Sequence, residues 1–173
     1  SPASVATPSG VGASFGSTDP ETGYPAFIDV ESWIDVHILN MLMLNVDALR
    51  LSSFFHKDRD GKVAAGPIWD FNISSGSRDR FGRPPRPSEP ETWRGISGDR
   101  GTDFFGNGTQ RWWGSLFADR DFQQAYCDRW NELRDGEFGT EHINALIDSM
   151  AEEVREAQAR NEERWDEVPP EYG

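Results

Sequence analysis

Cysteine is almost absent from this sequence: Cys127 is the single one, so no internal disulfide can form. Cys127 falls within an amphipathic helical pattern, where we expect a small apolar filler rather than a nucleophile. No apolar run is long enough to span a bilayer. Residues 1–17 have neither the basic start nor the continuous apolar stretch of a signal peptide, so we expect any secretion signal to lie upstream.

Basic residues are also scarce, with 17 Lys and Arg against 30 Asp and Glu and a net charge of -13. This balance argues against a nucleic-acid backbone or an anionic membrane surface as the partner. The length of 173 residues suits one domain, or one lobe of a larger one. Aromatic residues, in contrast, are abundant, with seven Trp and eleven Phe to fill a core or to form an exposed platform.

The chain divides into three parts. Residues 1–23 are rich in Ser, Gly, Ala, Thr and Pro, which is typical of a linker or a disordered lead-in. We expect a folded lobe over residues 24–168 and a short tail over 169–173. Its first helix is predicted to begin after Asp29, a plausible N-cap, and to run to about Leu44. Apolar residues recur at helical spacing along this segment: Trp33, Ile34, Ile38, Met41 and Leu42.

The last third of the chain is predicted to be helical. Helices are expected over 110–118, from Asp119 to a break at 136–139, and over 140–165, with Cys127 in the second of them. The third helix carries an apolar stripe and a charged opposite face, and the stripe consists of Ile143, Leu146, Ile147, Met150 and Val154. Before these helices, residues 78–109 read as a long irregular loop, which is often functional or mobile.

A β-hairpin is predicted in the middle, because Asp60-Gly61 lies between two β-prone runs at 48–57 and 62–70. The fold class is therefore α+β, a mostly helical lobe with a hairpin. With Asp60 and Gly61 as the two turn residues, three pairs of positions lie opposite each other: Asp70 and Leu51, Asn72 and Leu49, and Asp47 and Ser74.

This register predicts that three oxygen-bearing side chains share one face of the hairpin. Side chains alternate with period two, so Asp47, Asp70 and Asn72 fall together, with Asp47 and Asn72 about 7 Å apart. Carboxylate and amide oxygens in such a cluster suit Mg²⁺ or a metal–phosphate complex. A bulge near Gly66-Pro67 or a three-residue turn would change the parity.

The two aspartates also have an ordinary structural interpretation. Asp70 lies within the apolar run from Ile68 to Phe71, where a carboxylate is costly unless it is paired, hydrogen-bonded or bound to metal. Asp47 could cap a turn and Asp70 could accept backbone hydrogen bonds. The residues alone leave the metal site and this structural role both open.

Three stretches together resemble the central signature of the CotH (spore coat protein H) family of atypical kinases. They are Asn45-Val46-Asp47, the run from Arg50 to Asp58, and Gly66-Pro67-Ile68-Trp69-Asp70-Phe71-Asn72. The helix at 28–35 and the tail, including Arg129-Trp130 and the run 160–165, also resemble that family. The resemblance covers roughly residues 26 to 166, and the hairpin is its most specific part.

The resemblance implies a diverged protein-kinase-like C-terminal lobe that transfers the γ-phosphoryl group of ATP to Ser or Thr of a protein. It implies that Asp47 is the catalytic base and that Asn45, Asp70 and Asn72 bind the cofactor. Asp70 and Asn72 would be the ligands of Mg²⁺ or Mn²⁺. It also implies a secreted protein, or one on the cell or spore surface.

Two departures from the family pattern shape the expectations. The family usually has aspartate at the position of Asn72, and an amide oxygen brings less charge to a metal. No Gly-rich phosphate loop lies before Tyr24, so we expect the nucleotide-clamping N-terminal lobe upstream in the same parent protein. Without that lobe, this chain alone is expected to be inactive.

Two other functions remain as alternatives. The first is a non-catalytic CotH-like module that binds nucleotide weakly or contacts glycans through exposed aromatics such as Trp93, Trp112 and Trp113. The second is a metal-dependent hydrolase, which has no specific support, because the three histidines do not form a ligand-spaced set with the carboxylates. These are His37, His56 and His142, and His37 is predicted to be a hydrogen-bonded core histidine.

Overall fold

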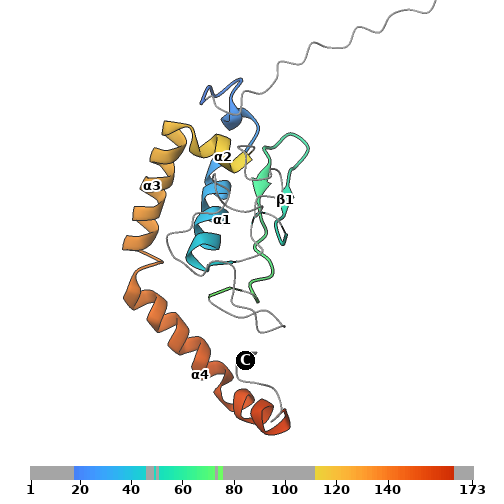
Figure 1. The fold of residues 1–173 in the computed structure, drawn as a ribbon, viewed down its shortest axis with the longest axis vertical. Coiled ribbons are helices and arrows are strands. Elements are labelled where there is room, and N and C mark those ends of the chain that lie inside the picture. Colours follow the sequence, from blue (N-terminus) through green and yellow to red (C-terminus); the bar gives the residue numbers. More distant parts are fainter. Residues whose placement is uncertain (1–17, 46–48, 50, 73, 76–111, 166–173) are drawn as a thin grey trace, which may run out of the picture.

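The computed structural model describes residues 18–45, 49, 51–72, 74–75 and 112–165. The elements are a 3₁₀ turn η1 (Tyr24–Ala26), helix α1 (Val30–Leu42), strands β1 (Phe55–His56) and β2 (Ala64–Ala65), and helices α2 (Trp112–Phe117), α3 (Arg120–Asp135) and α4 (Thr140–Arg164). The two strands pair antiparallel beside α1, and α3 lies on the other side of α1 (Figure 1). The predicted α+β class is confirmed.

Helix α1 begins as the sequence predicts. The Asp29 carboxylate accepts the Ser32 N–H, and the Ser32 hydroxyl donates to the Asp29 carbonyl at 2.8 Å. These bonds satisfy groups at the helix start that have no partner within the helix. The helix ends at Leu42, slightly earlier than expected. Its buried side chains face both the hairpin and α3: Trp33, Ile34, His37, Ile38 and Asn40.

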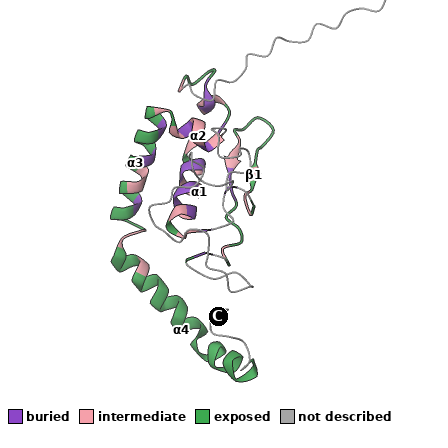
Figure 2. Ribbon diagram, viewed as in Figure 1, coloured by how far each residue is buried: buried purple, intermediate pink, exposed green. Residues whose placement is uncertain are grey.

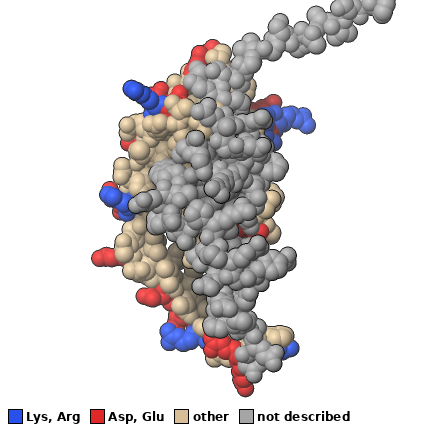
Figure 3. All heavy atoms as spheres, viewed as in Figure 1, with Lys and Arg blue, Asp and Glu red and all other residues tan. Residues whose placement is uncertain are grey.

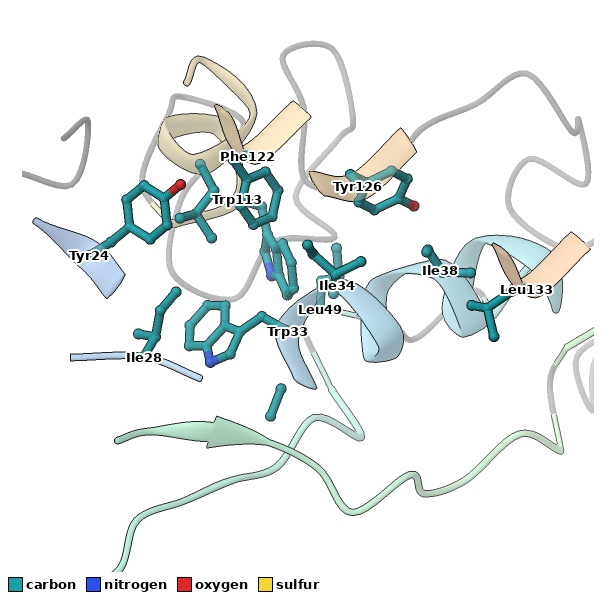
Figure 4. Packing of buried hydrophobic residues seen from close by; sticks show 12 residues of the cluster. Tyr24, Ile28, Trp33, Ile34, Ile38, Leu49, Trp113, Phe122, Tyr126 and Leu133 are labelled. Atoms are coloured by element: carbon teal, nitrogen blue, oxygen red, sulfur yellow. The ribbon is translucent and has the colours of Figure 1, made fainter. Parts of the chain in front are cut away.

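The core is built around Trp33. Its ring lies 4.9 Å from that of Phe55, 5.4 Å from Trp112 and 5.2 Å from Trp113 (centroid to centroid). Its indole N–H donates to the Val63 carbonyl at 2.9 Å, which ties α1 to the segment before β2. Figure 4 shows Trp33 and Trp113 packed together among buried side chains from α1, α2 and α3.

This packing removes one of the suggested glycan contacts, because Trp113 is buried. Trp112 is partly buried and packs against Trp33 and Phe55. Trp93, the third candidate, lies outside the described residues.

Helices α1 and α3 are joined by two polar contacts. The fully buried His37 has its Nδ1 2.9 Å from the Tyr126 hydroxyl, which confirms the predicted core histidine. Arg129 donates two hydrogen bonds to the Asp35 carboxylate, at 2.7 and 3.0 Å, and a third to Glu132. A bidentate pair of this kind fixes orientation as well as distance.

Helix α3 begins where the sequence predicts, and the Asp119 carboxylate caps it by accepting the N–H groups of Asp121 and Phe122. Its buried face includes Phe122 and Tyr126 but not Cys127, which is exposed. The expectation of an apolar filler at Cys127 is therefore wrong. Because Tyr126 points inward, the next residue along the helix falls outside the buried stripe.

Helix α4 has the predicted extent but no buried residue. Its apolar stripe is largely uncovered, with side chains about half exposed at Leu146, Ile147, Met150 and Val154. Figure 2 shows the helix exposed along nearly its whole length, in contrast to α1. Figure 3 shows both acidic and basic side chains on the lower part of the molecule, where α4 lies in Figure 1. Within the described chain, no helix combines the length and apolarity needed to cross a membrane.

Candidate functional site

The hairpin is shorter than expected, and its register is displaced by one residue. Phe55 pairs with Ala65 and His56 with Ala64, which shifts the predicted partners. The turn N–H of Gly61 donates to the Asp58 carbonyl at 3.1 Å, so Arg59 and Asp60 are the central turn residues, not Asp60 and Gly61. The predicted pairing of Asp70 with Leu51 belongs to the other register and is therefore wrong. A one-residue shift also reverses which side chains of the two strands share a face.

Regular pairing also stops well before the candidate site. The Gly66 N–H donates to the Phe54 carbonyl at 2.9 Å, and Gly66 has a φ of 122°, which favours glycine. The residues that follow leave the sheet. Asp70 is exposed, and its neighbours Ile68 and Trp69 are 44% and 60% exposed. The expectation of a carboxylate within an apolar environment is therefore wrong.

Asp70 is positioned by a hydrogen bond from Ser52, which lies on the segment before β1. The Ser52 hydroxyl donates to Asp70 Oδ2 at 3.0 Å, across the segments that precede β1 and follow β2. Beside this pair, the rings of Phe54 and Trp69 meet edge to face, 6.3 Å apart, and both are about half exposed. The segment thus presents a carboxylate and an aromatic pair to solvent.

The segment that follows α1 and the segment that follows β2 also meet at the C-terminal end of α1. The Ser75 N–H donates to the Met43 carbonyl at 2.6 Å, which brings Ser75 against the C-cap residue of α1. Asn45 is buried there, and its side-chain amide donates to the Asn40 side-chain oxygen Oδ1 at 3.0 Å. Asn45 is therefore held by α1 on one side of the site, near the segment that carries Asp70 and Asn72.

The connection between Asn45 and β1 has its own anchors. Leu49 is a buried core residue, and its N–H donates to the Ser53 hydroxyl at 3.1 Å. That hydroxyl in turn donates to the Leu51 carbonyl. This local arrangement fixes the backbone next to Ser52, so the Ser52 hydroxyl is presented from an ordered loop.

Residues with positive φ are concentrated in two segments, residues 44–52 and residues 70–75. All five non-glycine residues with positive φ in the described chain lie here: Leu44, Leu49, Ser52, Asp70 and Ser75. Each such conformation costs about 1–3 kcal/mol, and such residues gather at functional sites when the surrounding structure holds them in place. The hydrogen bonds at Asn45, Ser53, Ser75 and Asp70 are the local contacts that do so.

The structure describes only some of the predicted site residues. Asn45 and Asp70 lie on the two joined segments, and Asn72 is exposed two residues beyond Asp70. Asp47, the predicted catalytic base, lies outside the described residues, as does its predicted proximity to Asn72.

The donor set fits a sparse magnesium site. The described residues contain no group of three His, Cys, Asp or Glu side chains that could hold a metal. Mg²⁺, however, is commonly bound through one or two carboxylates, with phosphate oxygens and water completing its octahedron. The exposed Asp70 carboxylate, fixed through one oxygen by Ser52, suits that kind of site, and Asn72 can add an amide oxygen.

Sequence reasoning missed Ser52. It lies inside the run from Arg50 to Asp58 that carried the family resemblance, but no local pattern identifies a serine that reaches 18 positions along the chain. The contact of Ser52 with Asp70 depends on the route of the chain after Gly66, and the predicted strand register gave that route wrongly.

Comparison with protein families gives a match over nearly the whole chain. A family model described as CotH kinase protein matches residues 10–170. The chain belongs to the CotH kinase family. No curated protein and no solved structure matches it in the corresponding comparisons. For this CotH kinase family member, a kinase-related function follows from the family, and the family in general implies ATP and a divalent metal.

Proposed function

We propose that this chain is the catalytic C-terminal lobe of an atypical protein kinase, which transfers the γ-phosphoryl group of ATP to Ser or Thr of a protein. The observation that carries the proposal is the contact between the segment at residues 44–52 and the segment at residues 70–75, both of which contain residues with positive φ. This contact places Asp70 on an ordered, solvent-accessible loop next to the segment that contains Asn45. Membership of the CotH kinase family supplies the reaction class.

The residues would divide the work as follows. Asp70, with Asn72, would hold Mg²⁺ against the ATP phosphates, and the metal would neutralise developing charge. Asp47 would orient the acceptor hydroxyl and take its proton. The hydroxyl oxygen forms a bond to the γ-phosphorus, the bond from that phosphorus to the β,γ-bridging oxygen breaks, and ADP leaves with the electron pair. Positioning and charge stabilisation account for most of the catalysis in such transfers.

Further parts of the proposal concern the parent protein. The nucleotide-clamping lobe would be supplied by residues upstream of this chain, and the protein would act after secretion or at a cell or spore surface. Family resemblance is the support for both statements.

The test is phosphate transfer from γ-labelled ATP by the full-length protein in the presence of Mg²⁺. Asp70→Ala is expected to lower the rate by at least about 100-fold, because the metal would lose its charged ligand. Asp47→Ala is expected to have a comparable effect. Asp60→Ala, which removes an exposed turn carboxylate of the same hairpin, serves as the matched control. Transfer that is unchanged in Asp70→Ala contradicts the proposal.

A non-catalytic nucleotide-binding role is the second candidate, and Asn72 is the residue that favours it. If an amide in place of the family's aspartate leaves too little charge for transfer, the full-length protein will bind Mg²⁺ and ATP but transfer no phosphate. Asn72→Asp distinguishes the two functions, since a gain of transfer in that variant identifies Asn72 as the cause.

A further inference from the structure

We infer that Ser52 is a positioning residue for the metal ligand Asp70, and that its hydroxyl sets the affinity of the site for a divalent cation. This inference rests on the proposed function, because it assigns Ser52 a role through the Asp70 carboxylate. Ser52 itself touches neither metal nor substrate in this assignment.

The geometry gives each carboxylate oxygen a separate role. Ser52 donates to Oδ2 of Asp70 at 3.0 Å, so that oxygen is engaged and Oδ1 is left for a metal in monodentate coordination. Within the described residues, this is the hydrogen bond that the Asp70 side chain makes. Asp70 is exposed, so without Ser52 its carboxylate would rotate among several rotamers.

Ordering of an exposed carboxylate affects how tightly a metal binds. A ligand that is already held in its bound orientation loses less conformational freedom when the metal arrives. Hydrogen-bond partners of metal ligands commonly change metal affinity by about 10–100-fold when they are removed. The hydroxyl also draws some charge from the carboxylate, but for an exposed ligand with a single partner we expect orientation to dominate.

Backbone conformation supports a specific role for this contact. Ser52 has a φ of 51° and Asp70 a φ of 62°, so both ends of the hydrogen bond are in the left-handed region. Asp tolerates this region better than most residues, whereas Ser does not share that advantage. Glycine would fit position 52 with less strain, but it would lack the hydroxyl.

The experiment measures Mn²⁺ binding to the full-length protein in the presence of ATP, by electron paramagnetic resonance, together with the Mg²⁺ dependence of phosphate transfer. Ser52→Ala removes the hydroxyl, and Ser52→Gly removes it while relieving the backbone. Both variants are expected to raise the dissociation constant for Mn²⁺ by about tenfold. Ser149→Ala, an exposed serine on α4, is the neutral control.

A merely structural role makes a different prediction. If Ser52 only ties two loops together, Ser52→Ala will lower thermal stability without changing the Mn²⁺ dissociation constant, and the inference is overturned. If Ser52→Gly restores wild-type metal binding, strain and not the hydroxyl was responsible, which also overturns it. Wild-type protein that binds no Mn²⁺ with ATP removes the basis for both proposals.

The outcomes separate this inference from the proposed function. Weaker Mn²⁺ binding in both Ser52 variants supports the positioning role even if no phosphate is transferred, in which case only the kinase assignment fails. Conversely, phosphate transfer that needs Asp70 and shows the same Mg²⁺ dependence in Ser52→Ala supports the kinase and overturns the role of Ser52.

Discussion

Helices α1 and α4 both carry apolar residues at helical spacing, but only one of them is buried. In α1, 13 residues long, the stripe packs against the hairpin, α2 and α3, and five of its side chains are buried. In α4, 25 residues long, no side chain is buried. The difference shows that amphipathic spacing specifies a helix and the direction of its apolar face, but does not specify what covers that face.

The largest difference in stability between α1 and α4 is expected from an Ile→Ala substitution made in each helix. Ile38→Ala removes a side chain that is 1% exposed and should lower the free energy of unfolding by about 2–5 kcal/mol. Ile147→Ala changes a side chain that is 56% exposed and should alter it by less than about 0.5 kcal/mol. Urea unfolding followed by tryptophan fluorescence measures both. A large loss in Ile147→Ala would mean that α4 is covered by another surface in solution.

A smaller effect is expected from Tyr126→Phe, which keeps the ring but removes the hydroxyl that faces His37. Loss of a buried hydrogen bond should cost about 1–3 kcal/mol. The helix pair α1 and α3 would remain packed through its apolar contacts. Unfolding at neutral pH measures the loss, and an unchanged free energy would show that the contact contributes nothing to the pairing of these helices.

The same tyrosine gives the core a dependence on high pH. Burial raises the pKa of Tyr126, and burial together with Asp119 and Asp121 raises the pKa of Tyr24 to about 12. The unfolded chain therefore ionises first, near pH 10, and binds fewer protons than the folded chain. Stability is expected to fall as the pH rises above about 10, less steeply in Tyr126→Phe. A slope equal to that of the wild type would contradict this assignment.

The smallest difference in the free energy of unfolding is expected between substitutions of two ion-paired arginines, one in α3 and one in α4. Arg129 joins α3 to Asp35 of α1 through two hydrogen bonds, whereas Arg155 pairs with Glu152 inside α4. Arg129→Met should cost about 1 kcal/mol, because the bidentate contact crosses between helices. Arg155→Met should cost less than about 0.5 kcal/mol, as is usual for an exposed pair within one helix. Equal losses would remove the distinction between the two regions.

The parts of the fold that local chemistry dictates were predictable from the sequence. Asp29 is the N-cap that the sequence predicts, α3 begins after Asp119 as predicted, and the break at 136–139 separates α3 from α4. These signals act within one or two helical turns. The core position of His37 was also predicted, whereas the sequence left open whether the tryptophans at 112 and 113 fill a core or form an exposed platform.

The candidate site was less predictable, because it depends on register and on the route of irregular chain. The strands pair Phe55 with Ala65, one residue away from the predicted register, and this shift reverses the face that Asp47 was predicted to share with Asp70 and Asn72. The contact of Ser52 with Asp70 arises after the chain leaves the sheet at Gly66. Family resemblance drew attention to these segments, whereas pairing rules gave the wrong geometry for them.

The uncovered α4 has a consequence for the way the protein unfolds. A helix without buried contacts lacks the tertiary packing that supplies most helical stability in proteins. Backbone amides of α4 should therefore exchange with solvent through local fraying, while those of α1 exchange only when the core opens. The described lobe would then lose its helical signal in two steps, and one melting temperature would not describe both.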